Sequence, residues 1–155
     1  MLHTESITSG TLETLKQLMR DETLQDFFLV GGTALALYMG HRKSIDLDLF
    51  TLHSFDAPRM RAYLTDRYGL SNAFVRKDTV KGTIAEIKID CITYAYPLLE
   101  RVHEEGGIRL CSLRDIAAMK LSAIADSGTR LKDFASPLTS PSAICSAPTM
   151  RSIAA

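Results

Sequence analysis

The sequence lacks a net charge, a tryptophan and a long apolar segment, and it has only three cysteines. Its 18 Lys and Arg residues balance its 18 Asp and Glu residues, which excludes the basic excess of a protein that coats nucleic acid. No apolar run approaches the roughly 20 residues of a membrane-spanning helix. The first residues lack the basic-then-apolar pattern of a secretory signal, and the cysteines, which have no CxxC spacing, predict neither a disulfide framework nor a zinc site. We therefore expect a cytoplasmic protein without membrane association.

What is present fits one globular domain. The chain has 155 residues, of which 46% are hydrophobic and 23% are charged, as in an ordinary folded protein. We expect this domain to occupy residues 1–134. Residues 135–155 contain three of the five prolines among many Ser and Ala residues, with no Asp or Glu, so we expect a poorly ordered tail there.

Apolar periodicity divides the domain into alternating helices and strands. The helices are predicted at residues 11–20, 33–39, 56–68 and 112–126. The strands are predicted at residues 27–30, 45–50, 74–77, 82–94 and 108–111. We expect Ser9 or Thr11 to cap the first helix and Gly40 to end the second. Ser112 and Asp115 predict a start resembling a capping box for the last helix.

Two glycines, Gly31 and Gly32, stand between the predicted strand 27–30 and the predicted helix 33–39. Glycines at such a turn let backbone N–H groups approach a phosphate, and the dipole of the helix N-terminus favours a negative charge there. An ordinary turn is the alternative interpretation of a glycine pair taken by itself.

Two acids, Asp46 and Asp48, alternate with apolar residues along the predicted strand 45–50. Residues i and i+2 of a strand point to the same side, so the two carboxylates lie together. Like charges this close are costly unless a cation lies between them, and Mg²⁺ is held by one or two carboxylates plus substrate phosphates. Two solvated acids on an exposed strand face are the alternative. Together with the glycine turn, the pair predicts a site for a nucleoside triphosphate and its metal ion.

Asp90 is the candidate for a third acid, on the polar face of the predicted strand 82–94 with Glu86 and Lys88. If this strand pairs beside strand 45–50, Asp90 reaches the other two acids. It would then act as a general base on an acceptor hydroxyl or as a ligand of a second metal ion. Glu86 is the rival, and spacing does not separate the two. A charge on the solvated side of a sheet is the alternative to either role.

Two runs of this sequence resemble one protein family. The first is FLVGGTALAL followed by GHRKSIDLDLF, at residues 28–37 and 40–50, and the second is LRDIAAMKLSAI at residues 113–124, followed by KDF at residues 132–134. Both resemble the nucleotidyltransferase AbiEii/AbiGii toxin family, which belongs to the DNA polymerase β-like nucleotidyltransferase superfamily. The resemblance covers about residues 3–134.

The resemblance implies an α+β fold of the polymerase β-like nucleotidyltransferase type, a mixed sheet flanked by helices. It implies an enzyme that moves a nucleoside monophosphate from an NTP donor to a hydroxyl acceptor with Mg²⁺ or Mn²⁺. The acceptor would be the 3′ end of tRNA or a protein. The resemblance also implies the toxin of a toxin–antitoxin or abortive-infection system, with a separately encoded antitoxin as its partner.

Carried over by position, the resemblance also implies site residues. It assigns the triphosphate to Gly31, Gly32 and Thr33, the metal ion to Asp46, Asp48 and Asp90, and further positions of the motif to Lys120 and Asp133. Ser44 is a further candidate at the nucleotide, with ordering of the turn as its alternative role. Lys120 would neutralise developing phosphate charge as a point cation, whereas a lysine snorkelling from an amphipathic helix is the alternative.

After Phe134 the sequence departs from the family, whose members continue with further helices, and Pro137 ends any helix there. We expect the C-terminal helical part to be truncated. One alternative function is therefore a catalytically inactive relative that binds a nucleotide or a protein partner. Another is a nucleic-acid-binding module that uses a basic patch of Arg59, Arg61, Arg67, Arg76 and Lys77. The metal motif specifies neither the NTP nor the acceptor.

Overall fold

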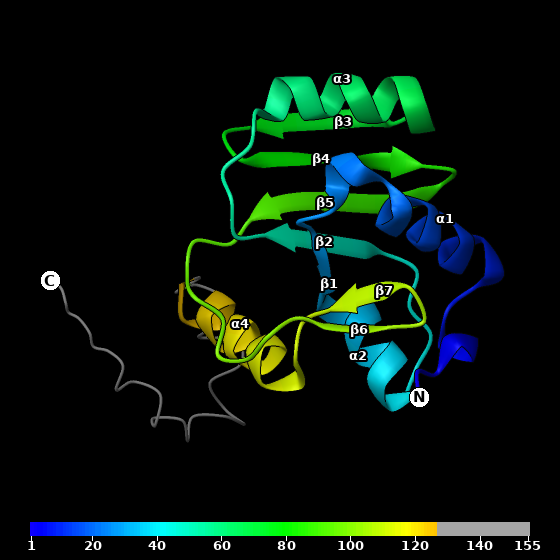
Figure 1. The fold of residues 1–155 in the computed structure, drawn as a ribbon, viewed down its shortest axis with the longest axis vertical. Helices are drawn as coiled ribbons and strands as arrows, with labels where there is room; N and C mark the ends of the chain where they lie inside the picture. Colours follow the sequence, from blue (N-terminus) through cyan, green and yellow to red (C-terminus); the bar gives the residue numbers. More distant parts are fainter. Residues whose placement is uncertain (127–155) are drawn as a thin grey trace, which may run out of the picture. The chain divides into compact units, whose positions relative to one another are not determined.

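The computed structural model describes residues 1–126 (Figure 1). The chain divides into two compact units, Met1–Ile116 and Ala117–Ala155, of which the second is described only over residues 117–126. The predicted tail at 135–155 lies outside the described residues, as do Asp133 and Phe134.

The described residues form helices and strands in mixed order. The helices are α1 (Ser9–Arg20), α2 (Gly31–Met39), α3 (Ala57–Tyr68) and α4 (Leu113–Asp126), with short 3₁₀ turns at Thr4–Ser6 and Glu22–Leu24. The strands are β1 (Phe28–Val30), β2 (Leu47–Thr51), β3 (Ser71–Arg76), β4 (Thr79–Ile84), β5 (Ile87–Thr93), β6 (His103–Glu105) and β7 (Ile108–Leu110). Within residues 1–126, no helix is long and apolar enough to cross a membrane.

Within the described residues, the seven strands form one mixed sheet in the order β3-β4-β5-β2-β1-β7-β6. The central strands β2 and β5 run parallel, and β1 pairs antiparallel with the other edge of β2. Helix α3 packs on β3 and β4 at the upper end of the sheet in Figure 1, and α2 packs on β1 and β2. The predicted α+β class, a mixed sheet flanked by helices, is confirmed.

The two faces of the central strands differ in burial. Leu47 and Leu49 of β2 are fully buried, and the register places them beside Ile89 and Cys91 of β5, which are also buried. The intervening residues Asp48 and Phe50 are only partly buried. This alternation follows from the twofold period of a strand, which sends apolar side chains into the core and the acids to the opposite face.

Several helix ends agree with their sequence signals. Met60 and Leu64 of α3 are buried, as their spacing predicts, and the Asp56 carboxylate accepts a hydrogen bond from the Arg59 amide to cap the helix. Gly40 ends α2 in the left-handed conformation, with φ of 63°. The predicted cap of α1 is wrong, because Thr8, rather than Ser9 or Thr11, accepts the capping hydrogen bond.

The largest error in the predicted elements concerns residues 82–94. This run is not one strand, because Ala85 and Glu86 both adopt positive φ, 50° and 67°, and form a tight turn between β4 and β5. Such a turn usually has Asn or Gly at these positions, so the Ala-Glu pair gave no signal for it. Strand β2 also begins later than predicted, at Leu47, and Ile45 is exposed rather than buried.

Candidate functional site

The site begins where β1 ends and α2 starts, at Gly31 and Gly32. Gly31 has a φ of 75°, and a Cβ atom on it would collide with the carboxylate of Asp48. A Cβ atom on Gly32 would come within 2.6 Å of the Arg42 guanidinium. Both positions therefore need glycine because side chains of the β2 region lie against this turn.

The N-terminus of α2 is suited to a phosphate. Val30 precedes the helix as its N-cap residue and makes no side-chain hydrogen bond to it. The first N–H groups of a helix have no partner within the helix, and its dipole places partial positive charge there. The Arg42 guanidinium lies over Gly32, so a cation and free N–H groups converge on one place.

Thr33 and Ser44 connect the start of α2 with the segment that precedes β2. The Thr33 hydroxyl is 2.7 Å from the Ser44 hydroxyl and donates a hydrogen bond to the backbone carbonyl of Asp46. Thr33 is buried, and the Ser44 amide donates to the Ser6 carbonyl at 3.1 Å. The side chains of Thr33 and Ser44 thus order the segment before β2, which was the alternative role for Ser44. Direct contact of either residue with a nucleotide stays a prediction.

Asp48 and Asp90 lie side by side on neighbouring parallel strands. The register of β2 and β5 pairs these two residues directly. Asp90 is 7% exposed, and its Oδ2 is 3.4 Å from Lys81 Nζ of β4. Its other oxygen, Oδ1, is buried and has no hydrogen-bond partner among the described residues. A buried carboxylate oxygen left without a partner is costly, and a cation or a hydroxyl donor at this place would satisfy it.

The charges of the three acids act on one another. Burial, followed by the negative charges of Asp90 and Asp46, raises the pKa of Asp48 to about 6. Lys88 and Lys81 offset only part of this effect. A divalent cation beside Asp48 would reverse the balance, because opposite charge favours the ionised carboxylate.

The three acids of the predicted cluster differ in burial and do not form a complete set of metal ligands within the described residues. Asp46 precedes β2 and is exposed. Within residues 1–126, no three His, Cys, Asp or Glu side chains are arranged together as a ready-made metal site. Asp48 and Asp90 still fit a hard cation, because Mg²⁺ needs only one or two protein carboxylates when substrate phosphates supply the rest. Glu86, the rival of Asp90, lies in the β4–β5 turn and not on a strand face.

Two basic residues, Arg42 and Lys81, lie at the site. For Arg42 the sequence leaves two interpretations open, contact with a phosphate or the acceptor and a solvated turn, and the structure places its guanidinium over Gly32. Lys81 gives no signal in the sequence, because it stands just before the predicted strand 82–94. Recognition of the turn at residues 85–86 would have extended β4 back to Lys81 and paired it with Asp90, as the register shows. Lys120 is an exposed residue of α4 in the second compact unit, so its predicted role stays a prediction.

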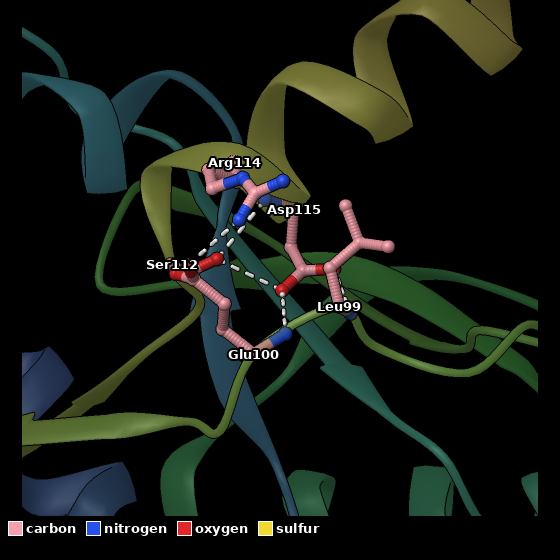
Figure 2. A network of polar contacts seen from close by, with 5 residues as sticks. All are labelled: Leu99, Glu100, Ser112, Arg114 and Asp115. Carbon is pink, nitrogen blue, oxygen red and sulfur yellow. Dashed lines mark hydrogen bonds and ion pairs between the residues drawn. The ribbon is translucent and has the colours of Figure 1, made fainter.

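A separate polar network holds the start of α4 to the chain after β5 (Figure 2). The Asp115 carboxylate accepts hydrogen bonds from the Leu99 amide at 2.6 Å, the Glu100 amide at 3.0 Å and the Ser112 hydroxyl at 2.8 Å. Burial would raise the pKa of Asp115, but these hydrogen bonds outweigh it and the pKa lies below its usual value. The Asp115 amide donates to Ser112 Oγ, which confirms the predicted N-cap.

Comparison with known proteins places this geometry in a family. Residues 13–97, just over half of the chain, match the family described as nucleotidyl transferase AbiEii toxin, type IV toxin–antitoxin system. An uncharacterised protein of Aquifex aeolicus is 36% identical over 126 residues, which are 79% of this chain and 61% of that protein. The chain thus spans less than two thirds of the length of this relative.

A solved structure shows a similar fold. A proposed nucleotidyltransferase of Thermotoga maritima superimposes with a TM-score of 0.52 at 18% identity, over 85% of this chain and 94% of that one. Helicobacter pylori JHP933 gives a TM-score of 0.48 at 22% identity, over 75% of this chain and 58% of that one. The matched family segment contains the glycine turn, Asp46, Asp48 and Asp90. This chain has a nucleotidyltransferase fold and belongs to the AbiEii nucleotidyl transferase toxin family.

Proposed function

We propose that this protein transfers a nucleoside monophosphate from an NTP to a hydroxyl acceptor, with Mg²⁺ or Mn²⁺, as the toxin of a toxin–antitoxin pair. The observation that carries the proposal is the pairing of Asp48 with Asp90, whose Oδ1 has no partner, beside the uncapped N-terminus of α2. Family membership supports an antitoxin as the partner protein. The acceptor is the 3′ end of tRNA or a protein.

Each residue has a task in this reaction. The N–H groups of Gly31 to Thr33 and the Arg42 guanidinium bind the triphosphate. Asp48 and Asp90 would hold the metal ion, with the exposed Asp46 as a further ligand, and the ion would supply positive charge to the phosphates. Asp90 takes the proton of the acceptor hydroxyl.

In the proposed reaction one bond to phosphorus forms and one breaks. The acceptor oxygen forms a bond to the α-phosphorus while the bond from that phosphorus to the bridging oxygen of the β-phosphate breaks, and pyrophosphate leaves. Attack and departure are in line. Catalysis of this kind depends on positioning and charge stabilisation, which rigid strands and a helix terminus provide.

A second candidate function is nucleotide or partner binding without chemistry. One observation favours it: the three acids do not converge into a ready-made metal site within residues 1–126. This candidate predicts that NTP binds and protects the fold from thermal unfolding, but that no covalent product forms.

The experiment is transfer of label from each α-³²P-labelled NTP into total tRNA and into protein, with Mg²⁺, with Mn²⁺ or with EDTA. Asp48→Asn and Asp90→Asn should each lower the rate by about 100-fold or more. Asp66→Asn is the matched control, because Asp66 is an exposed acid of α3 away from the site. Equal transfer by the wild type and both site variants would refute the assignment, and NTP-dependent stabilisation without labelled product would favour the second candidate.

A further inference from the structure

Three aromatic residues form a continuous group next to the acids. The rings of Phe50 and Tyr94 stack with their centroids 5.8 Å apart and their planes at 22°. The ring of Tyr96 meets Tyr94 edge-on, with centroids 5.5 Å apart. Tyr96 is 60% exposed, and the other two are partly buried. We call these three residues the aromatic platform.

The platform continues the sheet face that carries the acids. Phe50 follows Asp48 by two residues on β2, so their side chains share a face at a separation of about 7 Å. Tyr94 follows Asp90 by four residues, just beyond β5, and its amide donates a hydrogen bond to the Thr51 carbonyl at 2.8 Å. The acids therefore lie at one end of a strip whose other end is aromatic.

The exposed end of the platform is held in place. Tyr96 lies in the segment that leaves β5, and Asp115 binds the amides of Leu99 and Glu100 a few residues further on (Figure 2). A short segment tied at both ends loses little conformational entropy when a ligand stacks on it, because most of that entropy was lost on folding.

The glycine turn and the platform lie on opposite sides of the acids along the strand direction. Strands β1 and β2 are antiparallel and Val30 pairs with Asp48. Gly31 therefore lies toward the beginning of β2, whereas Phe50 and Tyr94 lie toward the ends of β2 and β5. In an in-line transfer the acceptor approaches the α-phosphorus from the side opposite to the leaving pyrophosphate. With the triphosphate at the glycine turn, the acceptor side is the platform side.

Positive charge is found at the same end of the sheet. The Thr93 amide, next to Tyr94, donates a hydrogen bond to the carbonyl of Asp78 in the β3–β4 turn at 3.0 Å. Arg76 and Lys77 come directly before Asp78 and are exposed. An aromatic group with one exposed ring, Tyr96, at the same end of the sheet as two exposed basic residues fits single-stranded nucleic acid, because bases stack on rings and phosphates pair with cations.

We propose that the aromatic platform stacks the terminal bases of a single-stranded RNA acceptor and so directs its 3′ hydroxyl toward Asp90. This rests on the proposed function, and it selects RNA over protein as the acceptor. Phe50, Tyr94 and Tyr96 are positioning residues for the acceptor, with no part in binding the triphosphate.

The test measures RNA affinity and transfer separately. The probe is a short single-stranded RNA with a fluorescent label at its 5′ end, and its Kd is read by fluorescence anisotropy without NTP. Tyr96→Ala should raise this Kd by about tenfold, the scale of one lost base stack, whereas Tyr96→Phe should retain the wild-type Kd. In the transfer assay, Tyr96→Ala should raise the KM for RNA and leave the KM for NTP unchanged.

Phe74→Ala is the matched control, because Phe74 is an aromatic residue of β3 with 52% exposure outside the platform. An unchanged RNA Kd in Tyr96→Ala, an equal change in Phe74→Ala, or label found on protein independently of Tyr96 would each overturn the proposal. The RNA Kd is measured without NTP and therefore does not depend on catalysis. If the wild-type protein transferred no label, the proposed function would fail. The platform would still be tested by the effect of Tyr96→Ala on the RNA Kd.

Discussion

Replacement of Asp48 by Asn should stabilise the metal-free protein at alkaline pH. In the folded protein the pKa of Asp48 is raised from 3.8 to about 6 by burial and by the charges of Asp90 and Asp46. A difference of about 2 pKa units corresponds to about 3 kcal/mol. The folded state therefore binds the Asp48 proton more tightly than the unfolded state does, and the ionised carboxylate opposes folding.

The dependence on pH follows from this sign. Below about pH 4 the carboxyl group is protonated in both states and costs nothing. The cost develops as pH rises through the interval from about 4 to about 6, and it is complete above that interval. At pH 8 and in EDTA, Asp48→Asn should thus raise the free energy of unfolding by up to about 3 kcal/mol, or the melting temperature by on the order of 10 °C. At pH 4 the variant and the wild type should unfold alike.

The assay is thermal and urea unfolding from pH 4 to pH 8, with and without Mg²⁺ and NTP. Asp66→Asn, the exposed control on α3, should show no pH-dependent gain. Mg²⁺ with NTP should stabilise the wild type and should have a much smaller effect on Asp48→Asn, since the variant lacks the carboxylate that favours a cation. The reasoning would be refuted if Asp48→Asn lowered stability by the same amount at every pH, because a carboxylate with a structural role would behave in that way.

Three further predictions concern the glycine turn, the Asp115 network and Arg42. Gly31→Ala should lower the melting temperature and weaken NTP binding measured by calorimetry, since its Cβ would collide with the Asp48 carboxylate and its φ is positive; unchanged NTP affinity would contradict this. Asp115→Ala should lower the free energy of unfolding in urea by about 2 kcal/mol at pH 7, because two amides and a hydroxyl lose their acceptor. As the pKa of Asp115 lies below its usual value, this contribution is present above about pH 4 and is lost as pH falls further, so a difference that persists at pH 2 would argue against the carboxylate as its source. Arg42→Ala should raise the KM for NTP and leave the Kd for RNA unchanged; the reverse pattern would show that Arg42 contacts the acceptor.

Lys81 lies beside the residue assigned to accept the acceptor proton. Its Nζ is 3.4 Å from Oδ2 of Asp90. The other oxygen, Oδ1, has no hydrogen-bond partner among the described residues and is therefore the one placed to meet the hydroxyl.

Local signals in the sequence were sufficient for the parts of the site that lie within one short segment. Gly31 and Gly32 marked a strand-to-helix turn, and α2 begins there. The alternation around Asp48 predicted the face that carries it, because that face depends only on the twofold period of the strand. Gly40 and Ser112 predicted the ends of their helices for the same reason, since a cap is made within a few residues of the helix terminus.

Contacts between distant segments were decided by the tertiary structure alone. The pairing of Asp48 with Asp90 requires β5 to lie parallel to β2 in one particular register, and a shift by one residue would turn Asp90 to the opposite face. The turn at Ala85 and Glu86 had no sequence signature, because its positive φ angles are imposed by the hairpin rather than preferred by those residues. The sequence by itself therefore determined which residues could carry the chemistry, and strand pairing, a cooperative result of burying the whole core, determined which of them meet.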